Sequence, residues 1–88
     1  MKAVIAEMRE RLAVLDPARL DIRDDTARHA GHAGARSGGG HFVMTIVSPQ
    51  FAGRRTMERH RMVYDALGTL MKREIHALSI DAKTPEET

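Results

Sequence analysis

The first part of the chain has the hydrophobic period of an amphipathic helix. Charged residues fill the gaps between apolar positions that lie three or four residues apart. These apolar positions are Ile5, Met8, Leu12 and Leu15. The period predicts a helix over residues 2–15 with one buried face, and the Asp16-Pro17 pair ends it.

Three later segments have the patterns of β-strands. In RLDIRDD, which begins at Arg19, polar and apolar residues alternate, as in a strand with one buried face. HFVMTIVS (41–48) is apolar or β-branched at both parities, which predicts a strand covered at least in part on both faces. EIHALSI (74–80) alternates again and predicts a third strand.

A second amphipathic helix is predicted over residues 55–73, between the second and third strands. Its apolar face carries Val63, Leu67, Leu70 and Met71. Near the end of the chain, Thr84, Pro85 and Glu87 have the spacing of a helix N-terminus.

The resulting order, α-β-β-α-β, predicts a single α+β domain over residues 1–88. The first strand ends at the glycine-rich loop and the second begins directly after it, so the two should be antiparallel, and the long helix should return the chain so that the third strand runs parallel to the second. The expected architecture is a three-stranded mixed sheet with both helices on one face.

Composition excludes several classes of protein. The 88 residues include no cysteine, so the chain by itself offers neither a disulfide nor a thiolate ligand. The formal net charge of +2 is too small to indicate nucleic-acid binding by itself, and no nucleophile–base pair or carboxylate dyad indicates an enzyme. No apolar run is long enough to cross a membrane and the N-terminus is charged, so a cytoplasmic protein is expected.

Four histidines are predicted to meet at one end of the sheet. The first strand ends there, and the second and third strands begin there. The histidines are His29 and His32 in the glycine-rich connection, His41 at the start of the second strand and His76 at the start of the third. Imidazole is a common metal ligand, so a zinc or copper site built by this chain alone is one interpretation.

Two of the five histidines, His76 and His60, have expected surroundings that can be stated from their positions in the pattern. His76 has the parity of Leu78 and Ile80, so it should face the helices at the rim of the core. His60 lies near the start of the long helix, away from the other histidines, and we expect it to be a half-buried structural residue that hydrogen-bonds to the backbone.

Four arginines crowd the beginning of the second helix. Positive charge there opposes the helix dipole, which favours contact with an acidic partner or with nucleic-acid phosphates. A solvated basic surface offset by Glu58 is the alternative. The arginines are Arg54, Arg55, Arg59 and Arg61.

Several of these segments together resemble the BolA family. They are HFVMTIVSPQFAG, the Arg-His-Arg-x-Val-Tyr block of residues 59–64, HALSI (76–80) and the RHAGHAGA loop. The resemblance implies a class II KH-like fold with the element order derived above.

The resemblance also implies a shared metal centre. BolA proteins are partners of monothiol glutaredoxins, with which they hold a [2Fe-2S] cluster in cluster trafficking and iron sensing. In such a complex the glutaredoxin and glutathione supply the thiols. His76 would be the ligand from this chain, with His29 as a second ligand and His32 as its substitute. We therefore expect a monomer that forms a heterodimer with a glutaredoxin.

The same family resemblance carries a rival function. BolA proteins have been linked to transcription control, and KH-like folds bind nucleic acid. A DNA-binding regulator that uses the arginines of the second helix is therefore the alternative.

Overall fold

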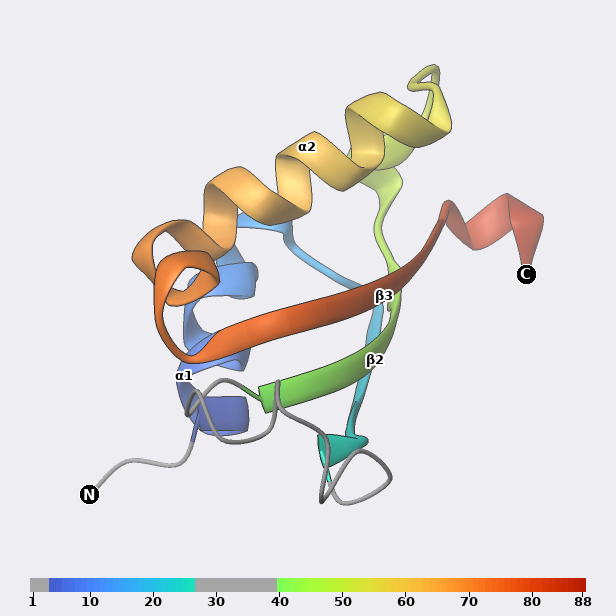
Figure 1. Cartoon of the computed structure of the whole chain (residues 1–88). Coiled ribbons are helices and arrows are strands. Elements are labelled where there is room, and N and C mark those ends of the chain that lie inside the picture. Colours follow the sequence, from blue (N-terminus) through green and yellow to red (C-terminus); the bar gives the residue numbers. More distant parts are fainter. Residues whose placement is uncertain (1–3, 27–39) are drawn as a thin grey trace.

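The computed structural model describes residues 4–26 and 40–88. His29 and His32 lie outside these residues. In the described part, the element order is that predicted from the sequence, with two α-helices, three strands and short 3₁₀ turns between them (Figure 1). No helix in these two ranges is long and apolar enough to span a membrane.

The three strands form one mixed sheet in the order β1-β2-β3. β1 (Arg19–Asp24) pairs antiparallel with β2 (Gly40–Val47), and β2 pairs parallel with β3 (Ile75–Lys83). The predicted strand directions are therefore confirmed. β3 continues past the predicted end at residue 80, because its ladder with β2 extends to the Val47–Lys83 pair.

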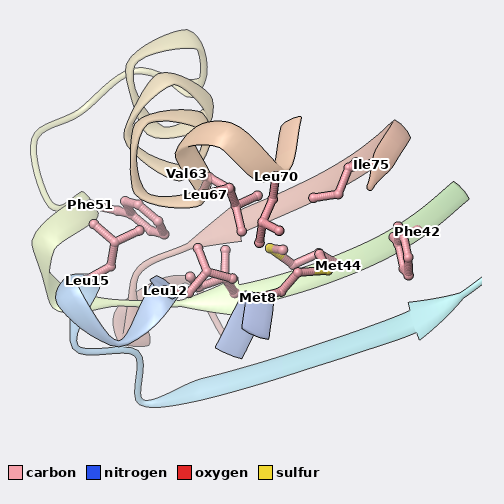
Figure 2. Packing of buried hydrophobic residues seen from close by; sticks show 11 residues of the cluster. Met8, Leu12, Leu15, Phe42, Met44, Phe51, Val63, Leu67, Leu70 and Ile75 are labelled. Carbon is pink, nitrogen blue, oxygen red and sulfur yellow. The ribbon is translucent and has the colours of Figure 1, made fainter. Parts of the chain in front are cut away.

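Both helices cover the same face of the sheet. α1 (Val4–Leu12) and α2 (Thr56–Leu67) contribute buried side chains to a cluster with alternate residues of β2 (Figure 2). The members of this core are Met8, Leu12, Leu15, Phe42, Met44, Ile46, Phe51, Val63, Leu67, Leu70 and Ile75. Alternation along β2 leaves the intervening side chains on the opposite, helix-free face.

Both predicted helices are shorter than the sequence pattern indicated. α1 is followed by a 3₁₀ turn, η1 (Ala13–Leu15), and α2 by another, η5 (Gly68–Lys72). Gly68 ends α2 with a backbone φ of 56°, a conformation that glycine adopts without a Cβ penalty. The Arg11 guanidinium then donates a hydrogen bond of 3.0 Å to the Leu67 carbonyl oxygen, which satisfies a free group at the helix end.

The start of β2 depends on the absence of a side chain at Gly40. A Cβ at this position would lie 2.6 and 2.8 Å from two ring carbons of Phe42, which is only 5% exposed. We expect Gly40→Ala to lower the free energy of unfolding by about 1–3 kcal/mol, because the buried ring has little room to move. Urea denaturation measures this, and a variant as stable as the wild type would contradict the close packing of Gly40 on Phe42.

Candidate functional site

One end of the sheet brings together the termini of the three strands. The Gly40 amide donates a hydrogen bond of 2.9 Å to the Glu74 carbonyl oxygen. The Asp25 amide donates a hydrogen bond of 2.7 Å to the His41 carbonyl oxygen. The His41 amide donates to Thr26 Oγ1 over 3.0 Å. The end of β1 and the starts of β2 and β3 therefore lie at one edge of the sheet, which we call the histidine edge.

A side-chain turn stabilises the end of β1 at the histidine edge. Asp24 Oδ1 accepts a hydrogen bond of 2.9 Å from the Thr26 amide. Hydrogen bonding to Thr26 lowers the pKa of Asp24 from its usual value. The carboxylate form thus holds Thr26 where its hydroxyl can accept the His41 amide.

Two imidazoles lie side by side at the histidine edge. The ring centroids of His41 and His76 are 5.3 Å apart, with the ring planes tilted by 46°. His76 is exposed, and His41 is half-buried. The structure thus confirms that these two histidines, which are far apart in sequence, meet at one end of the sheet.

The predicted orientation of His76 is wrong. Gly40 pairs with Ile75 but His41 pairs with Ala77, so β3 has one additional residue, His76, at this point. Ile75 is 3% exposed and occupies the core-facing position. The imidazole of His76 instead lies beside His41, whose neighbour in β2, Phe42, points into the core. A β-bulge of this kind redirects a side chain that simple alternation would bury.

The other histidines have different positions. His60 is half-buried on α2, as predicted, but among residues 4–26 and 40–88 no group hydrogen-bonds to its ring. His29 and His32, the predicted loop ligands, are outside these ranges. Within the same ranges, no group of three or more histidine, aspartate or glutamate side chains could hold a metal ion.

Arg59 must be removed from the predicted set of contact arginines. Its side chain is 12% exposed and forms two hydrogen bonds with the Glu87 carboxylate, of 2.7 and 3.1 Å. It also donates to the carbonyl oxygens of Arg54 and Ala82, and it lies 6.0 Å from the Phe51 ring centroid. The guanidinium therefore joins the start of α2 to the end of the chain. By contrast, Arg54, Arg55 and Arg61 are exposed.

Glu87 belongs to the turn that the spacing of Thr84, Pro85 and Glu87 had predicted as a helix N-terminus. The Thr84 amide donates to Glu87 Oε1 over 2.7 Å at the start of η6 (Pro85–Glu87). The local pattern did not reveal that the Glu87 carboxylate also pairs with Arg59, because Arg59 is distant in sequence. The hydrogen bond from Arg59, followed by that from Thr84, lowers the pKa of Glu87 to about 2.

This lowered pKa predicts an acid-dependent loss of stability. The ordinary pKa of the carboxyl is 4.5 and the folded value is about 2, so the Arg59–Glu87 contact stabilises the fold above pH 4.5 and stops doing so as the pH falls to 2. We expect Glu87→Gln to have a lower Tm than the wild type at neutral pH, with the difference disappearing across that interval. Glu86→Gln, in the same turn, is the control at neutral pH. A difference in Tm that persisted at pH 2 would contradict the assignment.

Two exposed hydrophobic residues on α2 were not recognised in the sequence pattern. Met57 is 80% exposed and Tyr64 is 40% exposed, and Arg61 lies between them. These three residues occupy positions i, i+4 and i+7, which lie on one face of a helix. The spacing could therefore have identified a second, exposed face of α2. It was missed because the buried face of the same helix dominates the pattern.

The fold and the site thus define a class of protein: a small α+β domain with an exposed histidine at one end of its sheet. The BolA-like protein family model matches residues 12–87. The chain belongs to the BolA-like family.

Individual relatives agree with this assignment. SufE-like protein 1, chloroplastic/mitochondrial, of Arabidopsis thaliana is 46% identical over 78 residues, which cover 83% of this chain and 21% of that protein. The DNA-binding transcriptional regulator BolA of Escherichia coli is 36% identical over 75 residues, covering 85% of this chain and 69% of that protein. The solved BolA domain of SufE1 from Arabidopsis thaliana is similar in fold, with a TM-score of 0.84, 41% identity, and 100% and 99% of the two chains covered.

The chain is shorter than several of the proteins it resembles. It spans 21%, 54% and 51% of the lengths of two Arabidopsis relatives and one mouse relative. The activities and partners of those whole proteins are therefore not transferred with the family. The two Arabidopsis relatives are named as chloroplastic/mitochondrial and chloroplastic proteins, which differs from the cytoplasmic location expected from the sequence, and that location stays a prediction.

Proposed function

We propose that this chain is a non-enzymatic partner of a monothiol glutaredoxin, with which it shares a [2Fe-2S] cluster for cluster trafficking or iron sensing. The observation that carries the proposal is the exposed imidazole of His76 beside His41 at the histidine edge. A partner can reach a ligand there without unfolding any part of the core. The chain alone is a monomer in this proposal, and the functional unit is a heterodimer.

The donor set of this chain fits such a shared centre. The sequence has no cysteine, so the chain can offer imidazole nitrogen but no thiolate. A [2Fe-2S] cluster accepts two histidines on one iron when cysteine thiolates hold the other, as in Rieske centres. The partner's cysteine and glutathione would supply the sulfur ligands, and His76 with His29, or His32 in its place, the imidazoles.

The chain's own residues have separate parts in this arrangement. The bulge at His76 turns the imidazole outward, while Ile75 keeps the strand anchored in the core. The backbone hydrogen bonds at Gly40 and Asp25 hold the start of β2 and the end of β1 together beside it. When bound, the cluster supplies one-electron chemistry, and nitrogen ligation raises its reduction potential relative to thiolate ligation.

Anaerobic reconstitution tests the proposal. The chain is mixed with a monothiol glutaredoxin, glutathione, ferric iron and sulfide, and the visible circular dichroism is compared with that of the cluster on glutaredoxin alone. A new spectrum together with a one-to-one heterodimer in size-exclusion chromatography is expected. A spectrum identical to that of glutaredoxin alone, with the two proteins eluting separately, would refute the partnership.

A DNA-binding regulator is the second candidate function. The exposed arginines Arg54, Arg55 and Arg61 lie near the start of α2, and the Escherichia coli relative is named a DNA-binding transcriptional regulator. Phosphate contacts by these three side chains would make the affinity fall steeply with salt. Duplex DNA titrated at low salt, with the triple glutamine variant as control, tests this candidate. Equal affinity of the two proteins, or no binding, would exclude it.

A further inference from the structure

One flank of α2 combines exposed apolar and basic side chains. Met57 and Tyr64 are two of the three exposed large hydrophobic residues among those described, at 80% and 40% exposure. Arg55 and Arg61 are exposed beside them. We call these four residues the α2 flank.

Two hollows run along the α2 flank and meet at the same side chains. One, of about 690 Å³, is lined by Arg55, Thr56, Met57, Glu58 and Arg61. The other, of about 330 Å³, is lined by Met57, His60, Arg61 and Tyr64. Because Met57 and Arg61 line both, the two hollows adjoin, and the part they share is lined by one apolar and one basic side chain.

The chemistry of this surface favours a protein over a nucleic acid. Methionine, tyrosine and arginine are the residue types enriched in the buried centres of protein–protein interfaces. A phosphate backbone would gain from Arg55 and Arg61 but not from the thioether of Met57. Glu58 also lines the surface, and its carboxylate accepts a hydrogen bond of 2.8 Å from the Arg55 amide.

We propose that the α2 flank is a docking surface for an acidic segment of a partner protein, in which carboxylates on both sides of one apolar side chain pair with Arg55 and Arg61 while the apolar side chain packs on Met57 and Tyr64. The charge of the surface selects the carboxylates, and the exposed Met57 selects the apolar anchor. The proposal does not depend on the cluster, since none of the four residues belongs to the histidine edge.

Nuclear magnetic resonance with the full chain and synthetic peptides tests this docking surface. The probe is a peptide with a leucine between pairs of glutamates. Its controls replace the leucine by serine or the glutamates by glutamines. We expect amide shifts over residues 55–64 with the probe and weaker binding of both controls. If the probe leaves these amides unchanged, or if the serine peptide binds equally well, the proposal is overturned.

Matched variants of the protein separate the two parts of the interaction. We expect Met57→Ala to weaken binding about tenfold through loss of apolar contact, and Arg61→Gln about threefold through loss of an exposed ion pair. Val14→Ala and Lys72→Gln, exposed residues on the 3₁₀ turns η1 and η5, should leave the affinity unchanged. Both flank variants have exposed side chains, so folding is retained and is checked by Tm.

A nucleic-acid arm completes the experiment. Duplex DNA is titrated into the same wild-type and Met57→Ala proteins. The proposal is overturned if DNA binds more tightly than the peptide, shifts the same amides, and binds Met57→Ala as well as the wild type. That result would show a phosphate-binding surface instead of a docking surface for an acidic protein segment. Peptide binding that needs both Met57 and Arg61, with weaker DNA binding, supports it.

Discussion

Replacing His76 by alanine should abolish the circular dichroism spectrum of the shared cluster while leaving the fold intact. The imidazole is exposed at a bulge, and the neighbouring Ile75 provides the core packing of this part of β3. A change at an exposed position outside any cap or buried network alters the free energy of unfolding by only about 0.5 kcal/mol. The measurement is the reconstitution with glutaredoxin and glutathione, accompanied by thermal denaturation of the variant alone.

Other histidine variants make this result specific. His29→Ala should weaken the cluster, and the double change of His29 and His32 should remove the loop ligand altogether. His60→Ala, on α2, should lower the Tm but keep the wild-type spectrum, because that ring is half-buried. His41→Ala tests whether the imidazole of His41, which lies beside that of His76, contributes to the cluster spectrum. Retention of the spectrum in His76→Ala, with its loss in a folded His60→Ala, would show that the roles were assigned to the wrong histidines.

Phe51→Ala should be the most destabilising of the variants considered. Its side chain is 0% exposed and is one of the largest buried side chains in the described core, with the Arg59 guanidinium 6.0 Å from the ring centroid. Phenylalanine-to-alanine changes in cores lower the free energy of unfolding by about 3–5 kcal/mol, through lost burial and the cavity that remains. That is a large part of the total stability of a small domain.

Urea denaturation and calorimetry measure this loss. Met57→Ala is the matched control, since Met57 is 80% exposed and its truncation should change the stability by less than about 0.5 kcal/mol. If the two variants were equally stable, the turn η4 (Pro49–Phe51) would not anchor the start of α2 to the core as the structure indicates.

The fold could be predicted because its information is local and periodic. The spacing of Met8 and Leu12 and the alternation of Leu20 and Ile22 each report on a neighbourhood of a few residues. Chain direction and the handedness of strand connections then determined that β1 and β2 are antiparallel and that β2 and β3 are parallel. The meeting of His41 and His76 followed from that topology.

The errors arose where one local pattern was extended without its tertiary contacts. Alternation placed His76 with Leu78, but the pairing of β3 with β2 inserts one additional residue and buries Ile75 instead. The crowding of arginines was interpreted as binding potential for all four. Arg59 is instead satisfied by Glu87, a partner 28 positions away that no local pattern links to it.

The sequence by itself therefore determined the element order, the core faces, the absence of thiol ligands and the end of the sheet at which His41 and His76 meet. Each of these follows from residue type and short-range spacing. Only the tertiary structure decided which way the imidazole of His76 points and which arginines near the start of α2 stay exposed. Both depend on register and on ion pairing between distant segments, which exist only after the strands and the C-terminal turn have packed together.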